Sequence, residues 1–202
     1  MATAALQVAS GNDDGREPGS GTPILNDASE LSMLSGSPNT FLALRFTGVN
    51  VAQGSTINSA PLEVYVVGTS YDDPDVDIYL DDVDNSAALT TGSNNLSGRT
   101  KTTAKATWTA TGIGAGWKSP PDLSALVAEV VGRAGWVSGN ALTVLFDSLS
   151  VNNNLRIRPY EYDTTLAAKL TIDYTAPGGS GHVVSRVARV RQASKEGRGL
   201  AR

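Results

Sequence analysis

The chain contains no cysteine and only one histidine, His182. Without thiols, neither disulfide bonds nor thiolate metal sites can form, and such a composition suits a reducing compartment. His182 follows the flexible-looking run Gly-Gly-Ser-Gly at 178–181, away from any structured acid or nucleophile. A Ser-His-Asp triad or a zinc site would need partners that the sequence does not place beside it. These absences argue against the common hydrolase and metalloenzyme classes.

Long apolar runs are also missing, because no stretch approaches the roughly 20 residues that span a bilayer. Residues 1–10 have no positively charged start, no long apolar segment and no convincing processing site. They therefore do not form a secretory signal. We expect a protein that is not secreted, is made or assembled in a cytoplasm, and has no membrane partner.

Glycine, proline and small polar residues are abundant. The 202 residues include 21 glycines and nine prolines, with many Ser, Thr, Asn and Asp between short apolar runs. This composition is typical of strands joined by turns rather than of a helical bundle. A hydrophobic content of 40% over this length is enough for one domain with a real core. The chain is therefore predicted to be all-β.

Charge is divided unevenly along the chain. Residues 1–177 contain 10 Lys and Arg against 19 Asp and Glu, a balance of −9, and residues 178–202 contain 6 against 1, a balance of +5. An acidic body that carries a basic arm indicates two different contact surfaces. We divide the chain into an N-terminal lead-in that contributes to the sandwich (1–40), a jelly-roll β-sandwich (41–177) and a basic C-terminal arm (178–202).

Alternating apolar residues predict a series of short strands. Residues 41–46 show the two-residue period of a half-buried strand most clearly. The other predicted strands are residues 6–9, 29–34, 60–67, 76–80, 105–109, 141–147, 155–160 and 168–174. Short strands at this spacing are typical of a β-sandwich or jelly roll with extended terminal arms.

One helix is expected among these strands. Ser119 is a candidate N-cap, and Pro120 and Pro121 suit a first helical turn. An apolar stripe follows at helical spacing: Leu123, Leu126, Val127, Val130 and Val131. Gly132 and Gly135 mark its end. A single short amphipathic helix in a sandwich is expected to cover an open end of the core.

Several segments resemble a known family of jelly-roll modules that are similar to carbohydrate-binding modules. The most specific segment is 135–142, Gly-Trp-Val-Ser-Gly-Asn-Ala-Leu. The resemblance spans about residues 5–175 and is also carried by 44–46 (Leu-Arg-Phe), 51–57 (Val-Ala-Gln-Gly-Ser-Thr-Ile) with Ala60, 82–85, 99–103, Trp108, 121–123 and 168–174. Modules of this family occur as appended domains of large bacterial surface proteins and as stand-alone proteins of tailed bacteriophages.

The phage form of the family fits this chain better than the secreted form. No secretory signal, no neighbouring domain and a basic arm are the three departures from the secreted form. The resemblance then implies a non-enzymatic virion protein, a capsid decoration or cement protein that stabilises the head shell. Its expected partners are the major capsid protein or another virion protein and further copies of the chain, with a homotrimer favoured.

The alternative function is a carbohydrate- or receptor-binding module of a phage head or tail fibre. Exposed tryptophans stack on sugar rings, whereas buried ones fill the core. Of the three tryptophans, Trp117 lies between Gly116 and Lys118 and is expected to be the most exposed, so it is the candidate for glycan stacking. Trp136 is expected to belong to the core, and Trp108 is the third candidate.

The basic arm contains the residues expected to bind a partner. They are Val183, Val184, Val187 and Val190 at helical spacing, with Arg186, Arg189, Arg191 and Arg198. The segment fits an amphipathic helix or an extended arm laid on a neighbour. Arginine pairs well with carboxylates on a protein or with phosphates. Six basic residues without interleaved aromatics, on a body of charge −9, make a poor general nucleic-acid binder.

Acidic clusters provide the candidates for a metal. Asp81, Asp82 and Asp84, preceded by Asp72, Asp73, Asp75 and Asp77, could hold Ca²⁺ through hard oxygen ligands. They lack the glycine and distal glutamate of an EF-hand loop. An acidic strand edge that prevents aggregation explains them equally well. A second group is Asp13, Asp14 and Glu17. No other cofactor is expected.

Glu161 and Asp163 are the best candidates for a catalytic carboxylate pair. Two acids at positions i and i+2 of a strand point the same way, as a glycosidase-like pair would require. The simpler interpretation is an acidic strand end that faces solvent, with Tyr160 and Tyr162 pointing inward. We favour that interpretation, and the chain is expected not to be an enzyme.

Overall fold

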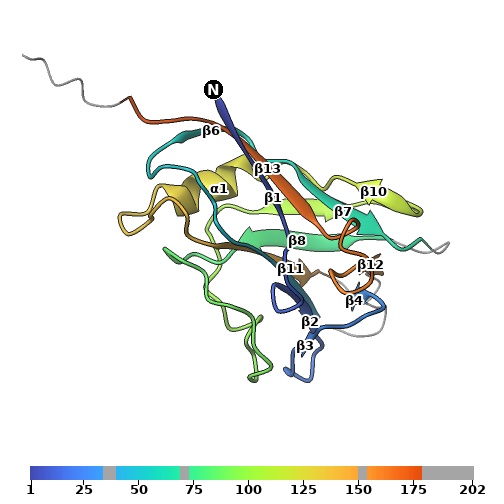
Figure 1. The fold of residues 1–202 in the computed structure, drawn as a ribbon. Coiled ribbons are helices and arrows are strands. Elements are labelled where there is room, and N and C mark those ends of the chain that lie inside the picture. The colour runs from blue at the N-terminus through green and yellow to red at the C-terminus, as the bar shows by residue number, and fades with distance from the viewer. Residues whose placement is uncertain (34–39, 69–72, 150–153, 179–202) are drawn as a thin grey trace, which may run out of the picture.

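The fold is built from two antiparallel β-sheets that pack face to face (Figure 1). The computed structural model describes residues 1–33, 40–68, 73–149 and 154–178. Within these ranges the chain forms 13 strands and one α-helix. The prediction of an all-β sandwich with a single short helix is confirmed, and the jelly-roll order of its strands stays a prediction.

The first sheet contains seven strands and holds both ends of the described chain. Its order is β1 (Ala2–Gln7), β13 (Lys169–Thr175), β7 (Leu62–Val66), β12 (Leu155–Ile157) and β4 (Leu31–Met33), with β6 (Thr56–Ser59) beside β13 and β10 (Gly116–Lys118) beside β7. Ala2 pairs with Tyr174, and Gln7 pairs with Lys169. The first and last strands therefore run side by side (Figure 1).

The second sheet contains six strands with β11 near its centre. Its order is β3 (Ile24–Leu25), β2 (Asp14–Glu17), β5 (Phe41–Phe46), β11 (Leu142–Ser148), β8 (Asp75–Leu80) and β9 (Ala106–Thr109). Val144 of β11 pairs with Leu44 on one side and with Leu80 on the other. Both residues that pair with Val144 are apolar because β11 crosses the middle of the core.

A single core lies between the sheets. Every second residue of the central strands points into it, as a two-residue period requires. The inward residues of the six-stranded sheet include Leu42, Leu44, Phe46, Leu142, Val144 and Phe146, and those of the seven-stranded sheet include Leu62, Val64, Val66, Leu170 and Ile172. All of them are at most 1% exposed. Contact between the two inner faces makes the body one domain.

Helix α1 (Ser124–Val131) closes one end of this core. It contacts β6 of one sheet and β8 of the other. Leu123, Leu126, Val127, Val130 and Val131 are all buried, so the predicted apolar stripe and its role are confirmed.

The predicted start of the helix is wrong, because Ser119 and both prolines precede it. Leu123 is the N-cap residue, and no side chain caps the helix. The carboxylate of the preceding Asp122 accepts hydrogen bonds from the backbone N–H groups of Ser124 and Ala60, each at 2.8 Å. The helix ends at Gly132 as predicted.

The lead-in is more regular than expected. Residues 1–33 supply β1 and β4 to one sheet and β2 and β3 to the other. Strands β2, β3, β6 and β10 were not predicted, because each is short and three of them are mainly polar or glycine-containing. No helix in the described ranges is long and apolar enough to cross a membrane.

Replacing Phe146 by alanine tests the single core. Phe146 is fully buried and pairs with Leu42 and Ile78 on the two neighbouring strands. We expect Phe146→Ala to lower the free energy of unfolding by about 3–5 kcal/mol, because the cavity lies where both sheets meet. Urea unfolding measures the change. Val137→Ala is the control, since Val137 is 62% exposed. A loss below about 1 kcal/mol for Phe146→Ala would contradict the shared core.

Candidate functional site

The segment that connects β8 to β9 folds over the outer face of the six-stranded sheet. Leu89 and Leu96 of this segment are buried against Ala43 of β5 and Leu145 of β11. These four side chains form a second, smaller apolar cluster. It explains why Ala43 and Leu145, which point away from the main core, are also fully buried. We call residues 81–105 the covering loop.

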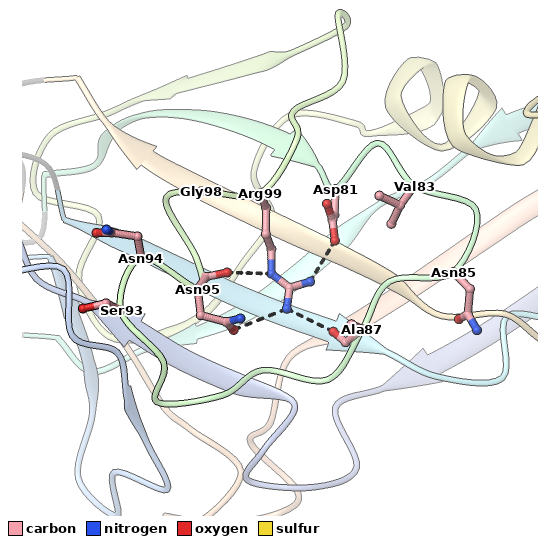
Figure 2. Close-up of a pocket in the computed structure, with 9 residues that line it drawn as sticks. All are labelled: Asp81, Val83, Asn85, Ala87, Ser93, Asn94, Asn95, Gly98 and Arg99. Atoms are coloured by element: carbon pink, nitrogen blue, oxygen red, sulfur yellow. Dashed lines mark hydrogen bonds and ion pairs between the residues drawn. The ribbon is translucent and has the colours of Figure 1, made fainter.

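Arg99 fixes the covering loop in place through hydrogen bonds from all three of its guanidinium nitrogens (Figure 2). Nη1 lies 2.8 Å from Asp81 Oδ2 and 2.8 Å from Ser86 Oγ. Nε donates to the carbonyl of Asn95, and Nη2 donates to the carbonyl of Ala87, both at 3.0 Å. The side chains of Arg99 and Asp81 are only 8% and 5% exposed. This is a buried ion pair with its hydrogen-bonding capacity largely used.

A depression of about 390 Å³ opens beside this ion pair. Asn85, Asn94, Asn95 and Ser93 line it together with the edge of Arg99 (Figure 2). Since the guanidinium already donates to protein acceptors, it is poorly placed to bind an anion in the depression. The geometry therefore assigns Arg99 to holding the covering loop.

The predicted calcium site at Asp81, Asp82 and Asp84 is not supported. Asp81 pairs with Arg99, while Asp82 and Asp84 pair with Arg133 at 2.6 and 2.7 Å. Arginines thus occupy the positions that a cation would take. Within the described ranges, no group of three or more acidic or histidine side chains is arranged to hold a metal ion.

The aspartates that precede this cluster in the sequence do not come together at one site either. Asp72 lies outside the described residues. Asp73 accepts a hydrogen bond from the backbone of Gly112, and Asp75 accepts one from Thr109 at 3.4 Å. Because each bonds to the segment that lies beside it, these acids tie neighbouring segments together rather than surround one point.

Asp77 lies on the outer face of β8, where its carboxylate is almost fully enclosed. Lys105 Nζ and Thr107 Oγ1 each lie 2.6 Å from one of its oxygens. Tyr79 donates a longer hydrogen bond of 3.3 Å. Burial raises the pKa of Asp77, but the bonds from Lys105 and Thr107 outweigh it and hold the pKa below its ordinary value of 3.8. The carboxylate therefore joins β8 to β9 in its charged form.

The three tryptophans differ in exposure in the expected order. Trp136 is 3% exposed and donates its indole N–H to the carbonyl of Val51 at 2.9 Å. Trp108 is 7% exposed. Trp117 is half-buried and is thus the most exposed of the three. The core position of Trp136 and the exposure of Trp117 are confirmed, and glycan stacking on Trp117 stays a prediction.

Trp117 is part of what we call the outer aromatic patch, which comprises Trp117, Tyr65 and Lys169 on the outer face of the seven-stranded sheet. The rings of Trp117 and Tyr65 meet edge to face with centroids 5.6 Å apart. Lys169 Nζ lies 4.2 Å from the centre of the Trp117 ring. A shallow depression of about 250 Å³ adjoins Lys169 beside β1. Sequence reasoning missed Tyr65 and Lys169, although both occupy outward positions of alternating strands.

Glu161 and Asp163 do not form a catalytic pair. The chain turns at residues 160–162 instead of continuing as a strand, so the expected common direction is lost. The Asp163 carboxylate accepts hydrogen bonds from the backbone and hydroxyl of Thr165 at 2.8 and 2.7 Å. Tyr160 packs partly against the core, whereas Tyr162 is 48% exposed beneath Arg158. Only one of the two tyrosines therefore points inward.

The acids of the second predicted group also bind different partners. Asp13 pairs with Arg45 at 2.6 Å. Glu17 accepts a hydrogen bond of 2.7 Å from the backbone of Leu96 and so holds the covering loop. Asp14 accepts one of 2.7 Å from the backbone of Tyr160. These three carboxylates do not converge on a shared cation.

The predicted partner-binding arm lies outside the described residues. This applies to Val183, Val184, Arg186, Val187, Arg189, Val190, Arg191 and Arg198. The described chain ends with residues 176–178, which follow β13 and are exposed. The role of the arm therefore stays a prediction.

Comparisons with known proteins give no assignment. No protein-family model matches the chain, and no curated protein is significantly similar to it.

Replacing Arg99 should lower the free energy of unfolding much more than replacing Arg133. Arg99→Ala leaves the buried Asp81 carboxylate without its cation, and we expect the free energy of unfolding to fall by about 3–5 kcal/mol. Arg133→Ala is the matched control, because it also removes an arginine that bonds to aspartates but is 33% exposed. Its loss should be clearly smaller. Urea unfolding of both variants checks this. Equal losses would contradict the anchoring role of Arg99.

The pH dependence of stability tests the Asp77 contact. Because the pKa of Asp77 is lower in the folded state, its contribution is complete above the ordinary value of 3.8 and is lost as pH falls through the folded value. Asp77→Asn should therefore lower Tm at neutral pH and make Tm decline less steeply below pH 3.8 than in the wild type. Thermal unfolding over an acidic pH series measures both slopes. Parallel slopes would show that Asp77 does not contribute in this way.

Proposed function

We propose that the chain is a non-enzymatic structural protein of a bacteriophage virion. It is a capsid decoration protein that binds and stabilises the head shell through its body and its basic arm. The observation that carries the proposal is the edge of the sandwich where the exposed strand β1 lies beside β13, the strand from which the chain continues into the arm. Two segments suited to contacts with other proteins thus begin at one place.

Strand β1 has the properties of a strand that can add to another sheet. It is the outermost strand of the seven-stranded sheet, and among the described strands it pairs with β13 alone. Its sequence, Ala-Thr-Ala-Ala-Leu-Gln, has no charge and no proline to block pairing. An edge of this kind can pair with a strand of a neighbouring protein. This supports assembly with further copies or with a shell protein.

The distribution of charge supports the same proposal. The arm carries a balance of +5 and the rest of the chain one of −9. A basic arm can therefore lie on the acidic body of an adjacent copy or on an acidic patch of the shell. Closed symmetry is the usual outcome for identical subunits, and a homotrimer is the arrangement that we propose.

The ion pairs of the body support a structural role. Asp77 and Asp13 bond to Lys105 and Arg45, and each of these two contacts joins a strand to another segment. Asp81 bonds to Arg99 within the covering loop. Charged side chains used in this way build a rigid body for binding, which is what a decoration protein needs.

The outer aromatic patch favours a second function, a carbohydrate- or receptor-binding module of a phage head or tail fibre. Trp117 and Tyr65 place two aromatic rings on one sheet face, next to the shallow depression beside β1. Aromatic rings in such a place can stack on sugars. Lys169 already covers part of the Trp117 ring, which leaves less of it for a ligand.

Co-sedimentation with undecorated capsids of the phage that encodes the chain tests the main proposal. Full-length protein should sediment with the shells, and a 1–177 truncation should not. A full-length variant with Arg186, Arg189 and Arg191 replaced by glutamine should bind more weakly, especially at moderate salt. Trp117→Ala is the matched control and should bind like the wild type. Failure of every form to bind shells, with glycan binding that Trp117→Ala abolishes, would contradict the proposal and favour the second function.

A further inference from the structure

Two carboxylates near the start of β2 each have a buried oxygen without a hydrogen-bond partner among the described residues. Asp14 is 1% exposed, and its Oδ2 accepts the hydrogen bond from the backbone of Tyr160. Its other oxygen, Oδ1, is buried and has no hydrogen-bond partner within the described residues. Glu161, next to Tyr160 in the chain, also has a buried oxygen without such a partner, Oε2. Buried polar atoms are nearly always satisfied, so two unsatisfied carboxylate oxygens need an explanation.

A third oxygen comes from Asn26. A Cβ atom placed on Gly11 would lie 1.2 Å from Glu161 Oε1 and 2.4 Å from Asn26 Oδ1. The two oxygens therefore lie around one point against the backbone of Gly11. Asn26 Nδ2 donates to Asn12 Oδ1 at 3.1 Å, which leaves the Asn26 oxygen, rather than its nitrogen, on the side of Glu161. Acceptor oxygens thus gather here with no donor between them.

The charge at this place is not neutralised by the contacts of the protein. The nearby Asp13 is paired with Arg45, which leaves Asp14 and Glu161. Buried charges are normally paired or bound to metal ions. Two carboxylates without a cationic partner match the charge of one divalent ion.

We propose that Asp14, Glu161 and Asn26 bind one calcium ion. All three offer oxygen, the ligand atom that hard divalent cations prefer, and the absence of sulfur and imidazole ligands disfavours zinc. Ca²⁺ accepts six to eight oxygens in flexible geometry, whereas Mg²⁺ needs a regular octahedron. Ligands on a strand start and on two turns suit the flexible ion, and water completes its coordination. This site shares Asp14 with the second acidic group suggested by the sequence, but it does not include Asp13 or Glu17.

The ion would join three separate segments. Asp14 begins β2, Asn26 follows β3 directly, and Glu161 lies in the turn between β12 and β13. Strands β2 and β3 belong to the six-stranded sheet, and β12 and β13 to the seven-stranded sheet. A bound ion therefore ties the two sheets together. Gly11 is required beside it, because any Cβ there would collide with the Glu161 carboxylate.

Calcium binding to the full-length protein tests the proposal. Protein stripped with EDTA and titrated with CaCl₂ by calorimetry should bind one ion per chain. Its Tm should rise by about 5–10 °C at calcium concentrations near 100 times Kd. Asp14→Asn and Glu161→Gln should each weaken binding by more than about 100-fold. Asp163→Asn is the matched control, because it changes a nearby acid whose carboxylate accepts hydrogen bonds from Thr165, and it should leave calcium binding unchanged.

Asn26→Asp provides a test that does not depend on removing a buried group. Asn26 is exposed and has a positive φ of 55°, which aspartate also tolerates. The substitution adds a third negative charge beside the ion, so calcium should bind about 10-fold more tightly. Without a cation the added charge would only increase repulsion and lower Tm.

The alternative is that Asp14 and Glu161 share a proton and bind no metal. In that case stripped wild-type protein would bind no calcium, and Asp14→Asn would raise Tm to the same extent with EDTA and with CaCl₂. Either result would overturn the proposal. Calcium binding that survives both Asp14→Asn and Glu161→Gln would also overturn it, because the ion would then lie elsewhere.

Discussion

A carboxylate that is withdrawn from water needs a cation or hydrogen-bond donors, and the loops of this sandwich are arranged around that requirement. Arg99 meets Asp81 and thereby joins the two ends of the covering loop to each other. Glu17 receives the backbone of Leu96 from the same loop. Asp122, which is exposed, joins the start of α1 to Ala60, the residue directly after β6. Each of these acids fixes a segment that apolar packing alone would leave free to move.

Asp14 and Glu161 each have a buried carboxylate oxygen without a partner among the described residues. The oxygen of Asn26 lies beside Glu161, and Arg45 is paired with Asp13. A calcium ion would supply the missing positive charge and would connect the two sheets. The body would then be stabilised by the same principle throughout, with arginine or lysine at some acids and a metal ion at this pair.

Local sequence patterns predicted the regular elements well. The strands β5, β8, β9, β11 and β13 lie within one residue of their predicted bounds, because each has a clear two-residue alternation. The buried face of α1 was predicted for a similar reason. The start of the helix was missed because Ser119 followed by two prolines matches a helix N-terminus, and the sequence does not show that Asp122 bonds to Ala60 and Ser124.

The acids could not be grouped correctly from the sequence, because their partners lie far away along the chain. Asp14 meets Tyr160 across 146 positions, and Glu17 meets Leu96 across 79. Neighbouring acids such as Asp13 and Asp14 point to different segments. Alternation tells which face of a strand a residue occupies, but it does not tell which loop will cover that face. The prediction of function from the sequence is limited in the same way. The edge strand β1 and the outer aromatic patch form only when strands that are distant in the sequence pair.

Strand β1, which lies beside β13, is the edge where the proposed partner would pair with this body (Figure 1). The acids stabilise the sandwich itself. The proposed contact surfaces are this edge, the outer aromatic patch and the basic arm. The proposed roles of the arm and the edge both require a body that keeps its shape when extended segments bind to a shell. Partnered buried carboxylates provide that rigidity.

A crystal structure of the full-length protein grown with CaCl₂, with anomalous diffraction measured, tests the central claim most directly. The account predicts one anomalous peak between Asp14, Glu161 and Asn26, with oxygen ligands at about 2.3–2.6 Å. A direct hydrogen bond between the two carboxyl groups, with no anomalous peak beside them, would contradict it.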